Sequence, residues 1–167
     1  MKLPLCQIDV KSGILCPRCQ SLVDKGEYDE WDIKVMRALL ELEESKMSFL
    51  RDFTYHKTLT THELLVVIVS APKTSPYILA RIGKALSDKL NMKVRVVEKT
   101  SSLKQLAGQV LAPAQVLGVN MLWLPDGSWE SIVRISKHDT RVLPAKIETL
   151  EDILSRINGF PVRIRAE

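Results

Sequence analysis

The chain has 167 residues, of which 46% are hydrophobic and 26% charged, and a chain of this length buries roughly 70% of its unfolded surface, enough for one sizeable core or two small ones. Its 24 basic and 20 acidic residues give a net charge of +4, which favours a nucleic-acid or ribosomal partner only weakly and fits a solvated basic surface equally well. No run of 18 apolar residues and no signal-peptide pattern occurs, so the sequence predicts a cytoplasmic protein without a membrane span.

All three cysteines lie in an N-terminal segment, residues 1–28, with the spacing C-x9-C-x2-C. Cys16 and Cys19 have the C-x2-C spacing of a zinc knuckle, and Cys6 is placed to supply a third thiolate. This pattern offers a structural zinc site with Cys6, Cys16 and Cys19 as ligands. Two other interpretations stay open: cysteines packed in a small core, and a reactive dithiol, which requires the pair at the start of a helix in a thioredoxin-like layout.

A fourth zinc ligand of the usual kind is missing nearby. Distant histidines are candidates, whereas nearby aspartates are harder and less usual zinc ligands. The histidines are His56, His62 and His138, and the aspartates are Asp9 and Asp24.

The stretch 29–70 predicts a helix followed by a hairpin. Apolar residues recur at helical spacing over residues 29–50, and three acids occupy the first turn, where the helix dipole favours negative charge. Residues 53–59 alternate as a strand, and the uninterrupted apolar run 64–69 predicts a buried strand that pairs back on it.

A second helix should run from Pro76 to Leu90. Pro76 suits a first turn, and Asn91 can adopt the left-handed conformation that ends a helix. Residues 94–98 alternate as a further strand. Between Lys73 and Lys99 the chain carries seven basic and two acidic residues, so this stretch has a local charge of +5.

Residues 101–117 predict one long amphipathic helix, which Pro113 should kink and Gly118 should end.

A hairpin between residues 119 and 136 follows from the Asp126-Gly127 pair, a strong signal for a two-residue turn. In that register Trp123 lies opposite Glu130. Trp123 has two interpretations: an exposed ring that stacks on a base or anchors a protein, and a ring that covers a small core.

The last part of the chain predicts a polar connector from 137 to 143, a helix ended by Asn158-Gly159, and a strand at 160–165. Helix, hairpin, helix and strand therefore occur twice along the chain.

This order resembles the type II KH domain, whose order is α-β-β-α-α-β, and three phrases resemble archaeal NusA-like proteins. The phrases are LLVVIV at 64–69, ALSDKLNMKVRVVEK at 85–99 and LAPAQVLGV at 111–119. The resemblance spans residues 29–167 and implies an α/β (α+β) fold of two small KH-like units, each a short β-sheet packed by helices. The first unit would comprise residues 29–100 and the second, degenerate unit residues 101–167, after the cysteine-containing segment 1–28.

One feature of KH domains is missing, namely the G-x-x-G loop that lets the backbone approach nucleic-acid phosphates. Its place is taken by Tyr77-Ile78-Leu79-Ala80, whose side chains we expect to block that approach. Basic side chains around it remain candidates for phosphate contacts from a broader surface. The predicted RNA-binding residues are Lys73, Arg81, Lys84, Lys89, Lys93 and Arg95 in the first unit and Arg134, Lys137 and Arg141 in the second.

No phosphate-binding loop, nucleophile elbow, zinc-protease helix or dinucleotide fingerprint occurs, so we expect no enzyme and no small-molecule substrate. The resemblance implies binding of single-stranded or ribosomal RNA, in transcription elongation or termination or on the ribosome. A competing hypothesis is a non-enzymatic adaptor whose KH folds have lost RNA clamping and bind RNA polymerase or a ribosomal protein. Structural Zn²⁺ is the one cofactor that we expect.

Overall fold

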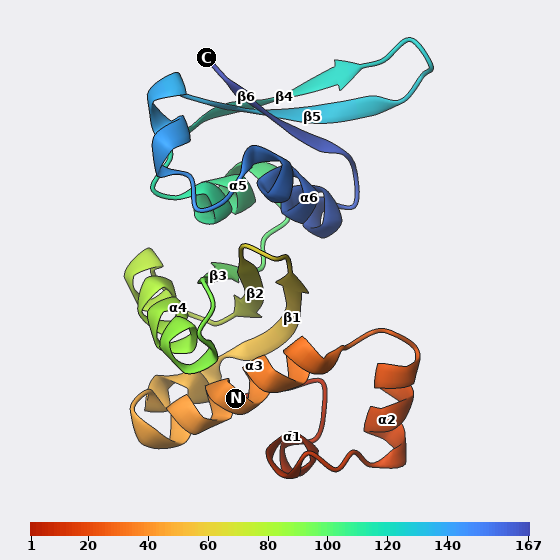
Figure 1. Cartoon of the computed structure of the whole chain (residues 1–167), viewed down its shortest axis with the longest axis vertical. Coiled ribbons are helices and arrows are strands. Elements are labelled where there is room, and N and C mark those ends of the chain that lie inside the picture. The colour runs from red at the N-terminus through yellow and green to blue at the C-terminus, as the bar shows by residue number, and fades with distance from the viewer. The chain divides into compact units, whose positions relative to one another are not determined.

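The computed structural model describes all 167 residues and divides into two compact units. Unit 1 comprises residues 1–60 and 65–98, and unit 2 comprises residues 61–64 and 99–167. Each unit contains one three-stranded sheet and its own helices, so the fold is mixed α+β with a cysteine-rich N-terminus (Figure 1). No helix combines the length and the apolar composition needed to cross a membrane.

Unit 1 starts with two short helices and a long one. These are α1 (Gln7–Ser12), α2 (Pro17–Asp24) and α3 (Glu30–Ser45). A short 3-10 helix, η1 (Ser48–Asp52), leads into β1 (Thr54–Thr60), β2 (Leu65–Ser70), α4 (Pro76–Leu90) and β3 (Val94–Glu98). Strand β2 lies in the middle of the sheet, antiparallel to β1 and parallel to β3.

Helix α4 occupies the residues that the sequence predicts. Ser75 caps its first turn, because the Ser75 side chain accepts a hydrogen bond from the Ile78 N–H. Asn91 ends it in the left-handed conformation, with φ of 53°. Ile82 and Leu86 of α4 are buried in one core cluster with residues of α3 and β2, so the helix packs its apolar face onto the rest of unit 1.

A fully buried carboxylate, Asp32, joins the start of α3 to strand β1. One of its oxygens accepts hydrogen bonds from the Thr58 N–H (2.9 Å) and the Tyr55 hydroxyl (2.5 Å). The other accepts from the Asp29 N–H (2.9 Å) and pairs with the Lys57 ammonium (2.8 Å). The sequence places Asp32 in the helix's first turn, but this anchoring to the strand becomes visible only in the folded structure.

Unit 2 repeats the order of helices and strands that unit 1 has from α3 to β3. It contains α5 (Leu103–Leu111), β4 (Val116–Trp123), β5 (Trp129–Ile135), the 3-10 helix η2 (Lys137–Val142), α6 (Ile147–Asn158) and β6 (Val162–Ala166). Strand β5 is central, antiparallel to β4 and parallel to β6. Both units therefore share a helix, an antiparallel hairpin, a second helix and a parallel strand.

The predicted helix over 101–117 is wrong in its second half. Helix α5 ends at Leu111, two residues before Pro113, which lacks the N–H that a continuing helix needs. Leu117 and Gly118 belong to strand β4. At Gly118 the guanidinium of Arg134 lies where a Cβ would be, so a larger residue there would require the Arg134 side chain to move.

The predicted register of the second hairpin is also wrong, by one residue. Trp123 pairs with Trp129, and Glu130 lies opposite Leu122. The turn is longer than two residues, because Leu124 and Ser128 close it through a hydrogen bond from the Leu124 N–H to the Ser128 carbonyl (2.8 Å). A three-residue loop with a left-handed glycine is the next most common hairpin connection.

Replacing Asp32 should destabilise unit 1 strongly. Asp32→Ala leaves the Lys57 ammonium and the Tyr55 hydroxyl without their carboxylate partner, and breaking a buried ion pair lowers the free energy of unfolding by about 3 kcal/mol or more. Urea denaturation followed by circular dichroism measures the change. Asp88→Ala, at an exposed position of α4, is the control and should change the midpoint little; an Asp32→Ala midpoint equal to that control would contradict the anchoring role.

Candidate metal centre and basic surface

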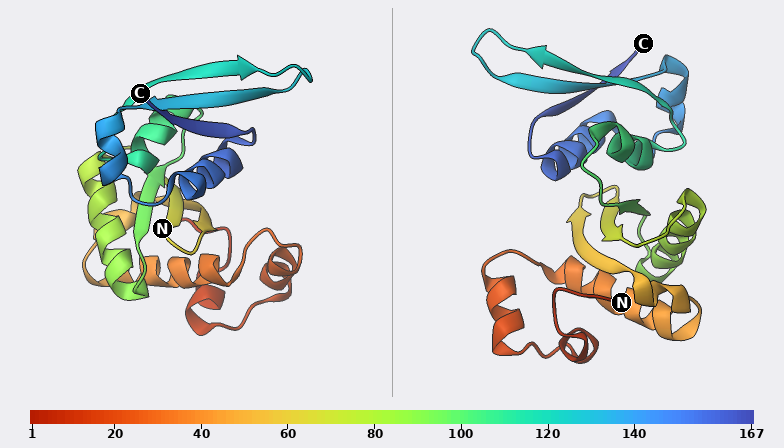
Figure 2. Two further views of the ribbon diagram at one scale, coloured as in Figure 1. Left: turned by 45° about the horizontal axis from the view of Figure 1, so that its top comes forward. Right: turned by 180° about the vertical axis from the view of Figure 1, so that it is seen from behind.

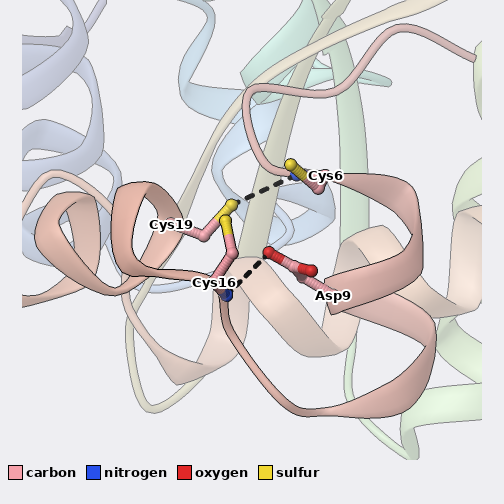
Figure 3. Close-up of side chains that lie close together, drawn as sticks. All are labelled: Cys6, Asp9, Cys16 and Cys19. Atoms are coloured by element: carbon pink, nitrogen blue, oxygen red, sulfur yellow. Dashed lines mark hydrogen bonds between the residues drawn. The ribbon is translucent and has the colours of Figure 1, made fainter.

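Four side chains in the N-terminal segment form a cluster of metal donors. The thiol sulfur atoms of Cys6, Cys16 and Cys19 and a carboxylate oxygen of Asp9 all lie within 4.8 Å of one another (Figure 3). Tetrahedral zinc with bonds of about 2.3 Å to sulfur holds neighbouring sulfur ligands about 3.8 Å apart. The four residues therefore lie close enough together to bind a metal ion.

Two short helices present these donors in the same way. Cys6 precedes the first turn of α1, and Asp9 follows it by three residues within that turn. Cys16 and Cys19 have the same positions in α2. Residues three apart lie on one face of a helix turn, so each helix directs one pair of donors into the cluster.

Backbone N–H groups connect the two pairs. The Cys6 N–H donates to the sulfur of Cys19 at 3.3 Å, and the Cys16 N–H donates to the Asp9 carboxylate at 3.0 Å (Figure 3). The bond from Cys16 lowers the pKa of Asp9, because it favours the charged form of the carboxyl group. Hydrogen bonds of this kind orient metal ligands from the outer shell.

Cys19 is fully buried, and burial raises the pKa of its thiol to about 12. The C-x2-C pair lies at the start of helix α2. The attacking group of a reactive dithiol is a thiolate near neutral pH, so Cys19 does not have that role. A metal ion, by contrast, can displace the thiol proton when it binds.

The cluster lies in a segment that packs on helix α3. Leu5, Val10 and Cys19 belong to the same buried cluster as the apolar residues of α3. The Arg37 side chain of α3 donates to the Val10 carbonyl at 2.9 Å, and the N-terminal ammonium pairs with Glu43 at 2.7 Å. A metal bound here would therefore stabilise the N-terminal part of unit 1.

Asp9, the less usual of the predicted choices, completes the donor set in place of a histidine. His56 lies on β1, where its ring nitrogen hydrogen-bonds to Ser70, and Asp24 accepts a hydrogen bond from Gln20. A signal for Asp9 is present in the sequence: C-x2-D at residues 6–9 has the same spacing as C-x2-C at residues 16–19.

Three of the predicted RNA-binding residues form what we call the α4 basic face: Lys73, Arg81 and Lys84. All three are exposed, and none has an acidic partner. Arg81 and Lys84 are three residues apart on α4, and Lys73 lies just before the helix. Tyr77, also in α4, is 76% exposed. The residues in place of the G-x-x-G loop, Tyr77 to Ala80, form the start of the helix instead of a loop.

The other predicted residues are less available or lie elsewhere. Lys89 pairs with Glu41 at 2.8 Å, and Arg95 is half-buried, with its pKa lowered by burial. Lys93 is exposed and directly precedes β3. In unit 2, the Arg134 guanidinium lies 3.5 Å from Glu167, whereas Lys137 and Arg141 are exposed on η2.

Comparison with known proteins supports the fold of this chain but indicates no activity. The sequence matches no protein-family model, and no curated protein matches it significantly. The chain is similar to a solved structure described as "Crystal structure of APE1850", with a TM-score of 0.53 and 17% sequence identity. The match covers 78% of this chain and 96% of that chain, so it supports the α+β fold of most of the chain.

Cobalt(II) titration tests whether Asp9 is a ligand. Asp9→Cys should add a fourth thiolate, raising the thiolate-to-cobalt charge-transfer absorption per bound ion by about one third and tightening binding. Asp24→Cys, at an exposed position outside the cluster, is the matched control and should leave both quantities unchanged. Equal spectra for Asp9→Cys and the unmodified protein would exclude Asp9 from the site.

Proposed function

We propose that this chain is a non-enzymatic RNA-binding protein that acts in transcription elongation or termination or on the ribosome, and that its α4 basic face contacts the RNA. The main support for this proposal is that Lys73, Arg81 and Lys84 are exposed and have no acidic partners, and that they lie in the most basic stretch of the chain. The resemblance of the sequence to type II KH domains supports the same partner, although unit 1 has one helix, α4, between β2 and β3 where the KH order has two.

The α4 basic face suits phosphate contacts made by long side chains. The Arg81 guanidinium lies 5.9 Å from the centre of the Phe49 ring, a cation–π contact that orients it. Because helix α4 replaces the glycine loop, the backbone cannot approach the phosphates as it does in KH domains. Three contacts to a single strand give a log–log salt slope of about −2, so the proposed binding is salt-dependent and tolerant of sequence.

We also propose that the ion bound by Cys6, Asp9, Cys16 and Cys19 is structural Zn²⁺. Three sulfur donors and one carboxylate form a closed set of four ligands, which leaves no open position for a substrate. Thiolates select zinc over the hard cations magnesium and calcium. The ion would hold α1 and α2 together beside α3, where the segment already packs.

The adaptor is the second candidate function, and two exposed isoleucines favour it. Ile8 of α1 is 79% exposed and Ile14, in the loop before α2, is 78% exposed. Exposed apolar side chains on a segment that a metal would hold rigid suit a protein contact. RNA polymerase or a ribosomal protein would be the partner in that case.

Charge reversal on α4 tests the RNA proposal. Lys73→Glu combined with Lys84→Glu should weaken binding of a labelled mixed-sequence single-stranded RNA and reduce the log–log salt slope by roughly 1 to 2 units, because two phosphate contacts are lost. Fluorescence anisotropy at several salt concentrations measures both quantities.

The matched control combines Lys25→Glu with Lys46→Glu, two exposed lysines of the same unit that lie outside α4. It changes the net charge equally and should reduce affinity less, with a smaller change of slope. Equal effects of the two double variants would reject the α4 basic face as the contact surface. No binding by the unmodified protein at low salt would favour the adaptor.

Metal analysis tests the zinc proposal separately. Protein purified without added metal should contain about one zinc ion per chain, and Cys16→Ser should lose it and melt at a lower temperature. Ser21→Ala, a change in the same helix α2, should retain the metal and the melting temperature. A zinc-free native protein that Cys16→Ser does not destabilise would remove the proposed site.

A further inference from the structure

Strand β4 differs from the other edge strands in having no charge. The sheets of units 1 and 2 have four edge strands, β1, β3, β4 and β6. Charged side chains occur on three of them: Lys57 on β1, Arg95 and Glu98 on β3, and Arg163 and Arg165 on β6. Strand β4, with the sequence VLGVNMLW, has neither a charge nor a proline. Edge strands usually carry such residues because these prevent pairing with another chain.

The free edge of β4 offers unpaired backbone groups. Leu124 and Ser128 are hydrogen-bonded across the hairpin, and hydrogen-bonded and non-bonded pairs alternate along an antiparallel ladder. Val119, Met121 and Trp123 therefore direct their N–H and C=O groups away from β5. None of these groups has a backbone partner elsewhere in the chain.

The same strand exposes large apolar side chains. Four of the nine large hydrophobic residues that are exposed in this chain lie on it: Leu117, Met121, Leu122 and Trp123. Trp123 is 66% exposed, and its ring contacts Trp129, which in turn contacts Phe160, with centroid separations of 6.4 and 4.8 Å. The end of the β4–β5 hairpin extends past helices α5 and α6 (Figures 1 and 2), so these helices leave it uncovered.

We propose that β4 pairs with β4 of a second copy of this chain, in antiparallel orientation, to form a continuous six-stranded sheet. Pairing about Met121 places Met121 of each copy opposite Met121 of the other, and Val119 opposite Trp123. In this arrangement the outward N–H and C=O groups meet as hydrogen-bonded pairs, and the apolar side chains of the two strands lie on matching faces. The contact has the two-fold symmetry of most protein dimers.

A second copy fits this edge better than RNA or a charged peptide. Nucleic acid requires cations that neutralise its phosphates, and β4 has none. A charged peptide finds no complementary charge on the strand. Two copies of an uncharged strand, in contrast, bring no like charges together and match each other's exposed apolar residues.

Sedimentation equilibrium of the full chain tests the proposal over concentrations of about 1 to 100 μM. The unmodified protein should form dimers in a concentration-dependent way, and high salt should not dissociate them. Met121→Lys should weaken dimerisation at least tenfold, because it places two ammonium groups opposite each other. Met121→Pro should do the same, since it removes an outward N–H without disturbing the bonds to β5.

Val142→Lys is the matched control, because Val142 of η2 lies in the same unit outside β4 and is also an exposed apolar residue, 47% exposed against 56% for Met121. It should dimerise as the unmodified protein does. Circular dichroism of each variant establishes that it is folded. A protein that stays monomeric over this range would overturn the proposal, as would dimers of unchanged affinity in both Met121 variants. A monomer whose RNA affinity falls in Met121→Lys would overturn it too and would assign the edge to RNA.

Discussion

The buried carboxylate of Asp32 is the interaction on which the arrangement of unit 1 depends. It accepts a hydrogen bond from the Asp29 N–H at the start of α3 and at the same time bonds to three residues of β1, Tyr55, Lys57 and Thr58. Because a buried charge is stable only when all its hydrogen bonds are made, the helix and the strand have one favourable relative position. The N-terminal segment and α4 both pack on α3. The Asp32 contact, which fixes α3 on β1, therefore also fixes the positions of the candidate metal centre and the α4 basic face relative to the sheet of unit 1.

Local signals explain why much of the fold follows from the sequence. Helix α4 has a proline in its first turn, an apolar stripe and a left-handed asparagine after its last turn, and each of these acts within a few residues. The hairpin β1–β2 follows from an alternating strand and a buried apolar run. Such patterns do not depend on distant parts of the chain, which is why residues 76–90 form a helix as predicted.

The two incorrect predictions concern the end of helix α5 and the turn between β4 and β5, where a short sequence signal is compatible with more than one local structure. Pro113 ends α5 instead of kinking it, and Asp126-Gly127 lies within a three-residue loop instead of a two-residue turn. A one-residue change of register moves every side chain of a strand relative to its partner, so Trp123 meets Trp129 rather than Glu130. Carboxylates are less usual zinc ligands than histidines, so the fourth donor, Asp9, is hard to predict, although C-x2-D at residues 6–9 repeats the spacing of C-x2-C at residues 16–19.

The two units have one topology but differ in what they expose. Unit 1 presents cations on and just before helix α4, whereas unit 2 has exposed apolar residues along an uncharged edge strand. Fold alone therefore does not decide what either unit binds. In our account unit 1 contacts RNA, the metal centre stabilises its N-terminal segment, and unit 2 brings two chains together, so that a dimer would offer two basic faces to one RNA and gain avidity.

The most direct test of this account is ultraviolet crosslinking of the purified full chain to single-stranded RNA, followed by mass spectrometry of the crosslinked peptides. We expect the principal crosslinks within residues 73–84, with exposed Tyr77 as the side chain best placed to react. Crosslinks confined to the N-terminal segment or to unit 2, with residues 73–84 unmodified, would contradict the assignment of the α4 basic face as the RNA-binding surface.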